Sequence, residues 1–179
     1  MRAQRVVAVA IAAVLAASLS GCRSGAPADD GPLSSADHMH DPIPGGSICT
    51  PYGGPQTDGF VTFTNFGGTT VTLDRVVLLR PRNQRLLGSY AVPGVSAIGN
   101  PHGWPPKDRS YWPPGWKDRK PVRGFRVAPG RTFNMALGVA PITSARSTDQ
   151  GMLVYYHDSS GDYVAKSYWA MIIGNLRGC

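Results

Sequence analysis

The 179-residue sequence contains no glutamate, and all eleven of its acidic residues are aspartate. Aspartate favours turns and helix caps over helix interiors. The chain also contains 22 glycines and 16 prolines, a composition that favours a loop-rich β protein over a helical one. With no glutamate and only four histidines, catalysis by paired carboxylates would have to rest on aspartate alone.

Recognisable catalytic motifs are lacking as well. The sequence has no nucleophile elbow, P-loop, paired zinc dithiols or HExxH segment. His157-Asp158-Ser159 contains the residue types of a hydrolase triad, but the three are consecutive in a predicted turn. Neighbours on an extended chain point to opposite faces, so they cannot form the hydrogen-bonded relay of a triad. We therefore expect no enzymatic activity.

The apolar run over residues 6–19 is too short to cross a membrane, since a spanning helix needs roughly 20 residues. It follows Arg2 and Arg5, as in a secretory signal peptide. The run ends in Leu19-Ser20-Gly21-Cys22, which resembles the bacterial lipobox. The resemblance implies that residues 1–21 are a lipoprotein signal peptide, that Cys22 carries a lipid, and that the protein is anchored at the outer face of the cytoplasmic membrane. The alternative is an ordinary signal peptide with a chance cysteine.

Only three cysteines are present. With Cys22 assigned to the lipid, Cys49 and Cys179 remain, and in an oxidising exported compartment such a pair most simply forms a disulfide. It would join the two ends of the folded domain and stabilise it by about 4–5 kcal/mol in the chain-entropy model. Two free thiols in a metal or redox site are the alternative, but the two cysteines lack the usual two-residue spacing.

Residues 22–48 are rich in glycine, proline, serine and alanine, and we expect a flexible tether that begins at Cys22. The tether contains Asp37-His38-Met39-His40-Asp41, whose imidazoles and thioether suit copper or zinc. It resembles the His/Met-rich segments of exported copper-handling proteins. Extracytoplasmic copper handling through His38, Met39 and His40, with His102 or His157, is therefore the alternative function. An incidental polar linker is the other interpretation.

Residues 47–179 are expected to form one domain, because short β-branched and aromatic segments alternate there with Gly/Pro turns. The pattern predicts about seven strands and no helix. Residues 60–66 and 69–73 flank Gly67-Gly68 and predict a hairpin. The change in apolar parity at Asp74-Arg75 predicts a β-bulge.

Further along the domain, residues 122–127 are expected to form a strand, and the strict alternation over residues 133–139 predicts a half-buried one. The segment from Asn65 to Leu73 and the turn from Val127 to Arg131 resemble the sandwich modules of exported actinobacterial proteins. The expected fold class is therefore an antiparallel, immunoglobulin-like β-sandwich.

Residues 93–120 interrupt this rhythm with a Trp/Pro-rich loop, in which Trp-Pro-Pro and Lys-Asp-Arg each occur twice. A structureless loop of this length is usually functional or disordered. Flat aromatics beside cations suit sugars, polyanionic polymers or a protein partner. The predicted contact surface consists of Trp104, Lys107, Arg109, Tyr111, Trp112, Trp116, Lys117 and Arg119. The alternative is that the tryptophans fold back and cover an edge or end of the sandwich.

The middle of the chain is strongly basic. Residues 75–131 contain twelve lysines and arginines against two aspartates, in a chain of net charge +7. Such a segment attracts anionic lipid head groups, cell-wall polymers or an acidic protein partner. A lipid-anchored exported protein rarely meets nucleic acid, so we exclude that partner, and a solvated basic face is the plain alternative. The sequence predicts a membrane-anchored binding or accessory module without a cofactor.

The first testable prediction concerns the lipid anchor. Cys22→Ser should release the protein from the membrane fraction or leave it unprocessed, because the acyl chains attached at this residue supply the anchor. Fractionation of cells that express the two forms measures the effect. Quantitative retention of the Cys22→Ser protein in the membranes after a high-salt wash would contradict the lipobox interpretation.

Overall fold

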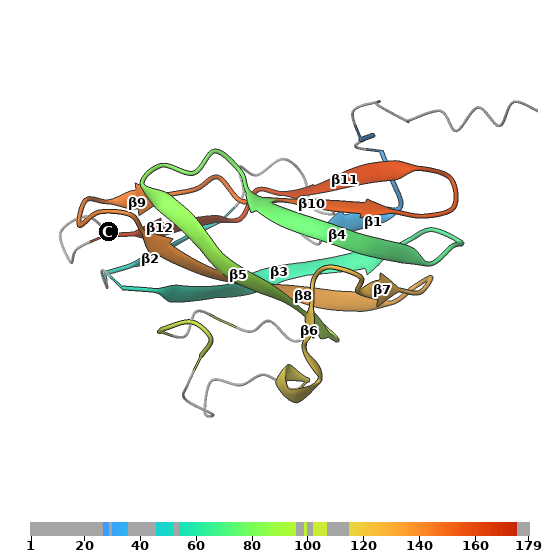
Figure 1. Ribbon diagram of the computed structural model, residues 1–179, viewed down its shortest axis with the longest axis horizontal. Coiled ribbons are helices and arrows are strands. Elements are labelled where there is room, and N and C mark those ends of the chain that lie inside the picture. The colour runs from blue at the N-terminus through green and yellow to red at the C-terminus, as the bar shows by residue number, and fades with distance from the viewer. Residues whose placement is uncertain are drawn as a thin grey trace, which may run out of the picture.

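The protein is an all-β sandwich, which confirms the expected fold class (Figure 1). The computed structural model describes residues 27–28, 30–35, 46–51, 54–95, 99, 102–106 and 115–174, the side chain of Phe60 excepted. Two sheets pack face to face, and a small third sheet lies at the left end of the view. The described residues contain twelve strands, more than the expected seven, because several are only two to four residues long.

The largest sheet has five strands in the order β1-β3-β8-β5-β6. These are β1 (Leu33–Ser35), β3 (Gln56–Asn65), β8 (Thr132–Pro141), β5 (Gln84–Pro93) and β6 (Lys120–Pro121). The opposing sheet comprises β11 (Asp162–Ser167), β10 (Met152–His157), β4 (Val71–Leu78) and β7 (Arg126–Val127). The end sheet comprises β2 (Ser47–Thr50), β12 (Ala170–Ile173) and β9 (Ser147–Thr148), with β2 and β12 parallel.

The core lies between the two larger sheets. Phe63 of β3 and Phe133 of β8 are fully buried, with their ring centroids 5.6 Å apart. Val71 and Leu73 of β4 are fully buried in the same cluster. The alternation that was visible in the sequence therefore directs one face of each strand into the space between the sheets.

The predicted hairpin of residues 60–66 and 69–73 is wrong, because β3 and β4 belong to different sheets. The chain crosses from one layer to the other at this turn, so the two apolar faces meet across the core. Asn65 holds the crossing: its side-chain amide donates to the carbonyl oxygens of Thr69 at 2.8 Å and Val127 at 2.9 Å. The turn therefore connects layers rather than neighbouring strands.

The predicted bulge near Asp74-Arg75 is confirmed. In the pairing of β10 with β4, Tyr155 lies opposite Arg75 and Tyr156 lies opposite Leu73, so Asp74 is the extra residue. The single strand expected over residues 122–127 is wrong, since the chain leaves β6 at Pro121, turns, and enters β7 in the opposing sheet at Arg126.

The predicted tether over residues 22–48 is wrong for β1. Leu33–Ser35 pairs antiparallel with β3, and Leu33 is buried in the core. The backbone N–H of Leu33 donates to the hydroxyl of Tyr156 at 3.0 Å, and Ala28 forms a bridge to β11. The segment is ordered because one leucine and a short run of backbone find partners on both sheets. Within the described residues, no helix is long and apolar enough to cross a membrane.

Asp149 connects the end sheet to the rest of the domain and is only 4 % exposed. Its carboxylate accepts hydrogen bonds from the backbone N–H groups of Gly151 and Met171 and from the side chain of Gln84. Burial raises the pKa of Asp149 from 3.8 to about 6, although these hydrogen bonds oppose the shift.

The second prediction concerns the pH dependence of stability that follows from the raised pKa of Asp149. Because the folded-state pKa lies above the unfolded value, Asp149 contributes most to stability below about pH 4, and that contribution is lost as the pH rises through about 6. The shift corresponds to about 3 kcal/mol. Asp149→Asn should therefore be more stable than the wild type by about 1–3 kcal/mol at pH 7.5 and should match it near pH 4.

Urea unfolding between pH 4 and 8 measures this difference. Gln84 favours the substitution, because its buried Oε1 has no hydrogen-bond partner among the described residues and can accept from the amide that Asp149→Asn introduces. Asp118→Asn, at an exposed site, is the control and should leave the pH dependence unchanged. A wild-type stability profile that runs parallel to that of Asp149→Asn would show that Asp149 titrates normally.

Candidate binding surface

Strand β8 is buried on both of its faces, contrary to the half-buried strand that its alternation predicted. One face belongs to the core, and segments from the Trp/Pro-rich loop cover the other. Gly138 shows how close the covering side chain lies, because a methyl group added there would overlap the indole of Trp104. The same indole lies above Gly88 on the neighbouring strand β5. Glycine at these positions leaves room for a ring against the sheet.

Trp116 anchors the second covering segment. It lies in the short 3-10 helix η3 (Trp116–Asp118), is 1 % exposed, and packs with Val92 of β5 and Ala136 of β8. Tyr90 joins this cluster: its ring stacks on Trp104 at 5.4 Å and meets Trp116 edge-on at 6.0 Å. The cover is thus a small aromatic core on the outside of the larger sheet.

The two residues that flank η3, Gly115 and Arg119, fix its position. Gly115 precedes it with φ of 89°, a left-handed conformation that favours glycine, and a Cβ there would lie 2.8 Å from the carbonyl oxygen of Pro93. Arg119 follows it and donates to the carbonyl oxygen of Trp116 at 3.1 Å. The Arg119 guanidinium also lies 4.9 Å from the Trp116 ring centroid and 5.3 Å from that of Tyr90. These contacts hold the backbone of the basic segment that follows.

The predicted contact residues have different environments. Trp116 is buried and contacts the sheet, so its assignment to a ligand-binding surface is wrong for the domain as folded. Trp104 and Arg119 are half-buried in the cover, whereas Lys117 is exposed. Four of the predicted contact residues lie outside the described residues: Lys107, Arg109, Tyr111 and Trp112. Cys22, Cys179, His38, Met39 and His40 also lie outside them.

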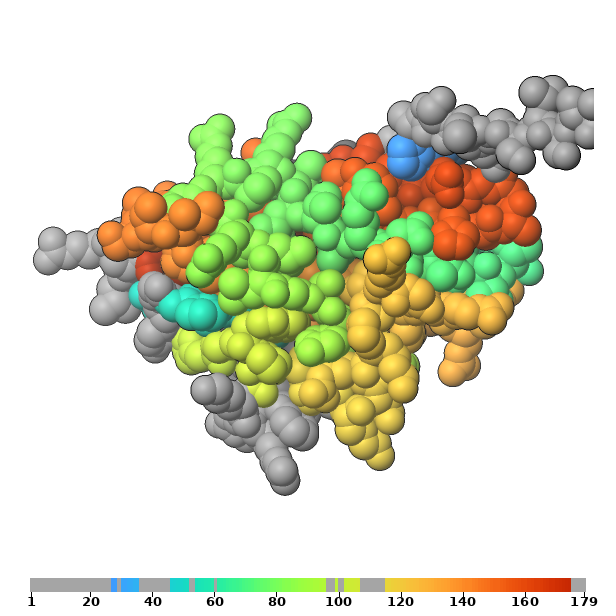
Figure 2. Space-filling view, in the orientation of Figure 1, coloured from blue at the N-terminus to red at the C-terminus, as the bar shows by residue number. Residues whose placement is uncertain are grey.

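The cover carries a basic segment, residues 115–131, along its solvent side. Five of its cations are exposed: Lys117, Lys120, Arg123, Arg126 and Arg131. Asp118 is the one acidic residue of the segment, and among the described residues the ion pair found is that of His157 with Asp74, elsewhere in the domain. Figure 2 shows this segment, in gold, standing out from the lower part of the visible face. The segment therefore presents cations that no described carboxylate neutralises.

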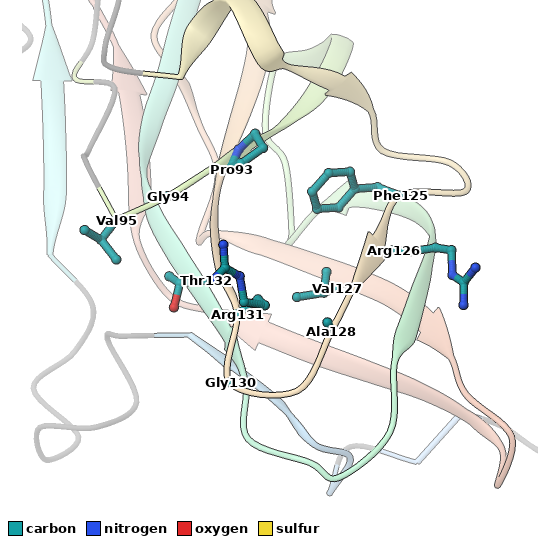
Figure 3. Close-up of a pocket in the computed structure, with 10 residues that line it drawn as sticks. All are labelled: Pro93, Gly94, Val95, Phe125, Arg126, Val127, Ala128, Gly130, Arg131 and Thr132. Carbon is teal, nitrogen blue, oxygen red and sulfur yellow. The ribbon is translucent and has the colours of Figure 1, made fainter.

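A groove of about 580 Å³ opens between the end of β5 and the turn that joins β7 to β8, and the second half of the basic segment forms one of its sides (Figure 3). Its lining residues are Pro93, Gly94, Val95, Phe125, Arg126, Val127, Ala128, Gly130, Arg131 and Thr132. Sequence reasoning missed this groove, because it treated residues 122–127 as one strand. The available signal was the sequence Val122-Arg-Gly-Phe125, in which glycine allows a turn between two short strands.

The histidines do not gather into a metal centre in the described part of the chain. His102 makes a hydrogen bond with Gln56 at 3.1 Å, and His157 pairs with Asp74 at 3.0 Å. No group of three or more metal-ligating side chains occurs among the residues that the structure describes. The two histidines therefore have separate protein partners, and His38 and His40 stay untested.

His157, Asp158 and Ser159 do not form a relay either. Asp158 accepts hydrogen bonds from Ser160 and Thr69, and those from Ser160 are the main reason why the pKa of Asp158 falls to about 2. His157 turns instead toward Asp74 on β4. The three residues close the hairpin of β10 and β11, as the sequence interpretation expected of polar turn residues.

Comparison with known proteins identifies no family. No protein-family model and no curated protein sequence matches this chain. The Vibrio cholerae VesB protease is similar with a TM-score of 0.39 and 14 % identity, over 80 % of this chain and 32 % of that one. PapD-like domain 7 of human CEP192 is similar with a TM-score of 0.38 and 12 % identity, over 97 % and 98 %. The secreted protease VesC of Vibrio cholerae has a TM-score of 0.32 and 14 % identity, over 76 % and 25 %.

The chain thus spans about a third of VesB and a quarter of VesC. At these TM-scores the similarities carry no argument about function. The assignment of the fold rests on the strand topology itself.

The third prediction tests the aromatic cover. Trp116→Ala should destabilise the domain by about 3–5 kcal/mol, since it removes a fully buried indole from a packed site. Lys117→Ala, at the adjacent exposed position, is the control and should change stability by less than about 0.5 kcal/mol. Urea unfolding compares the two variants. Equal stability of both variants would mean that Trp116 does not support the sheet.

Proposed function

We propose that this protein is a non-enzymatic binding module, held by a lipid at Cys22 on the outer face of the cytoplasmic membrane, whose basic segment binds an anionic polymer. The observation that carries the proposal is the set of five exposed cations on residues 115–131, none of which pairs with a carboxylate among the described residues. Like charges that lie close together raise the local potential and attract a polyanion. The buried Trp116 holds their backbone in place, so less conformational entropy is lost on binding.

The tryptophans contribute to this function in a different way from the one expected from the sequence. Trp104 and Trp116 pack against β5 and β8, and Lys117, which follows Trp116 in the chain, is exposed to solvent. Contact with the ligand therefore belongs to lysine and arginine, and the indoles position them. A phosphate-rich cell-wall polymer fits this arrangement, because it offers repeated anions to a row of cations.

The proposed lipid anchor at Cys22 is consistent with binding of an anionic polymer near the membrane. Ala28 forms a bridge to Tyr163 and is therefore fixed to the domain. Cys22 precedes Ala28 by six residues, and a fully extended chain of that length reaches at most about 20 Å. The domain would then stay close to the membrane, within reach of anionic polymers and head groups. We also propose the disulfide between Cys49 and Cys179, because β2 pairs with β12 and Cys179 follows the end of β12 by only six residues.

The fourth prediction tests the basic segment directly. The triple variant Lys117→Gln, Lys120→Gln, Arg123→Gln should bind poly(glycerol phosphate) at least about tenfold more weakly than the wild type at low salt. Its affinity should also fall less steeply as salt rises, because exposed charges are screened within about 8–10 Å at physiological ionic strength. Isothermal titration across a salt series measures both effects, and neutral dextran controls for polymer binding that does not depend on charge.

The matched control removes the same charge elsewhere. Arg82→Gln, Arg85→Gln, Arg146→Gln changes three exposed arginines outside the basic segment and should retain most of the affinity. If both triple variants lose affinity equally, net charge alone explains the attraction and the proposed site is wrong. If the wild type binds dextran as well as the phosphate polymer, the ligand class is wrong.

A further inference from the structure

The groove opens where the two larger sheets part, and it is lined in part by the second half of the basic segment. β5 of one sheet ends at Pro93 on one side, and β7 of the other sheet lies opposite. Phe125 lies between them and packs on the core residue Phe133, with ring centroids 5.5 Å apart. In Figure 3 the Phe125 ring and the Val127 side chain face the middle of the groove. The groove therefore leads from solvent to the edge of the hydrophobic core.

The polar backbone around the groove is already engaged. Six of its carbonyl oxygens accept hydrogen bonds: those of Gly94, Phe125, Val127, Ala128, Arg131 and Thr132. A sugar would need a set of well-placed polar partners, and an extended peptide would need free backbone groups along a strand. Because these carbonyl oxygens already accept hydrogen bonds, neither a sugar nor an extended peptide fits the groove well. What the groove offers is apolar surface.

The side chains around the groove combine apolar surface with positive charge. Val95 is 74 % exposed, an unusual position for a branched apolar side chain, and Pro93 and Ala128 are also exposed. Arg126 and Arg131 supply the charge, and none of the described residues that line the groove is acidic. Figure 3 shows Arg131 between Val127 and Thr132, whereas Arg126 points away. The complement of such a lining is a ligand with an apolar body and one anionic group.

We propose that this groove binds a single-chain fatty-acid anion, with the alkyl chain against Val95 and Phe125 and the carboxylate at Arg131. The volume of about 580 Å³ lies within the range of small-molecule sites. Arginine binds a carboxylate through two parallel hydrogen bonds, which fixes the position of the head group. The proposal goes beyond polymer binding, because the groove excludes Lys117, Lys120 and Arg123, and it stands if that function fails.

The fifth prediction is tested with decanoate as the probe. The protein is the mature chain from residue 22 with the Cys22→Ser substitution, so that it carries no acyl chain of its own. Decanoate should bind saturably and shift the amide resonances of residues 94, 95, 125–128 and 130–132. Butanoate, which has the same head group, and decyltrimethylammonium, which has the same chain and the opposite charge, should each bind at least tenfold more weakly.

Three variants locate the site. Arg131→Gln should weaken decanoate binding about tenfold, and Val95→Asp should abolish it while the fold is kept, because Val95 is exposed. Arg123→Gln is the matched control, since this exposed arginine lies outside the groove, and it should bind decanoate like the wild type. Equal binding by Arg131→Gln and Arg123→Gln, equal binding of decanoate and decyltrimethylammonium, or resonance shifts that do not saturate would each overturn the proposal.

Discussion

The burial of β8 on both faces is the constraint on which the rest of the surface depends. The inner face packs in the core around Phe133. The outer face is also buried, which requires a second set of side chains to cover it. Trp104 and Trp116 supply it, and Gly138 lets the first indole lie directly on the strand. Fully burying a large side chain contributes about 1.5–3 kcal/mol, so the buried Trp116 stabilises the position of η3 on the sheet, and the half-buried Trp104 adds to the cover.

This cover determines where the cations and the groove lie. After β5, the described parts of the chain place Trp104 and Trp116 on the outer face of the larger sheet, pair with that sheet again at β6, and then enter the opposing sheet at β7. The cations next to Trp116 are thereby placed on the solvent side of a fixed backbone. The same crossing draws Phe125 to the gap between the sheets, which forms one wall of the groove. Residues 115–131 thus contain both Trp116, which covers β8, and the exposed cations of the candidate binding surface.

The sequence predicted the all-β class and the bulge at Asp74, because period-two alternation and a change in its parity are local signals. It misassigned the turn after Asn65, because alternation tells which face of a strand is apolar but not whether two strands pair or pack across a core. It missed the outer cover of β8 for a related reason. Ala136 and Gly138 were interpreted as a solvent face, yet small residues are also what a covering indole requires.

The absence of glutamate helps to explain why the exposed cations of residues 115–131 form no ion pair with a described carboxylate. Two aspartates bind backbone N–H groups: Asp149 accepts from those of Gly151 and Met171, and Asp158 accepts from those of its own turn. A carboxylate used in this way is fixed in place and cannot reach across the surface to a lysine. A longer acidic side chain, with more rotatable bonds, would pair more readily with exposed cations. Asp149 and Asp158 therefore stabilise turns of this domain, and the cations of residues 115–131 stay unpaired with any described carboxylate, as the proposed binding of an anionic polymer requires.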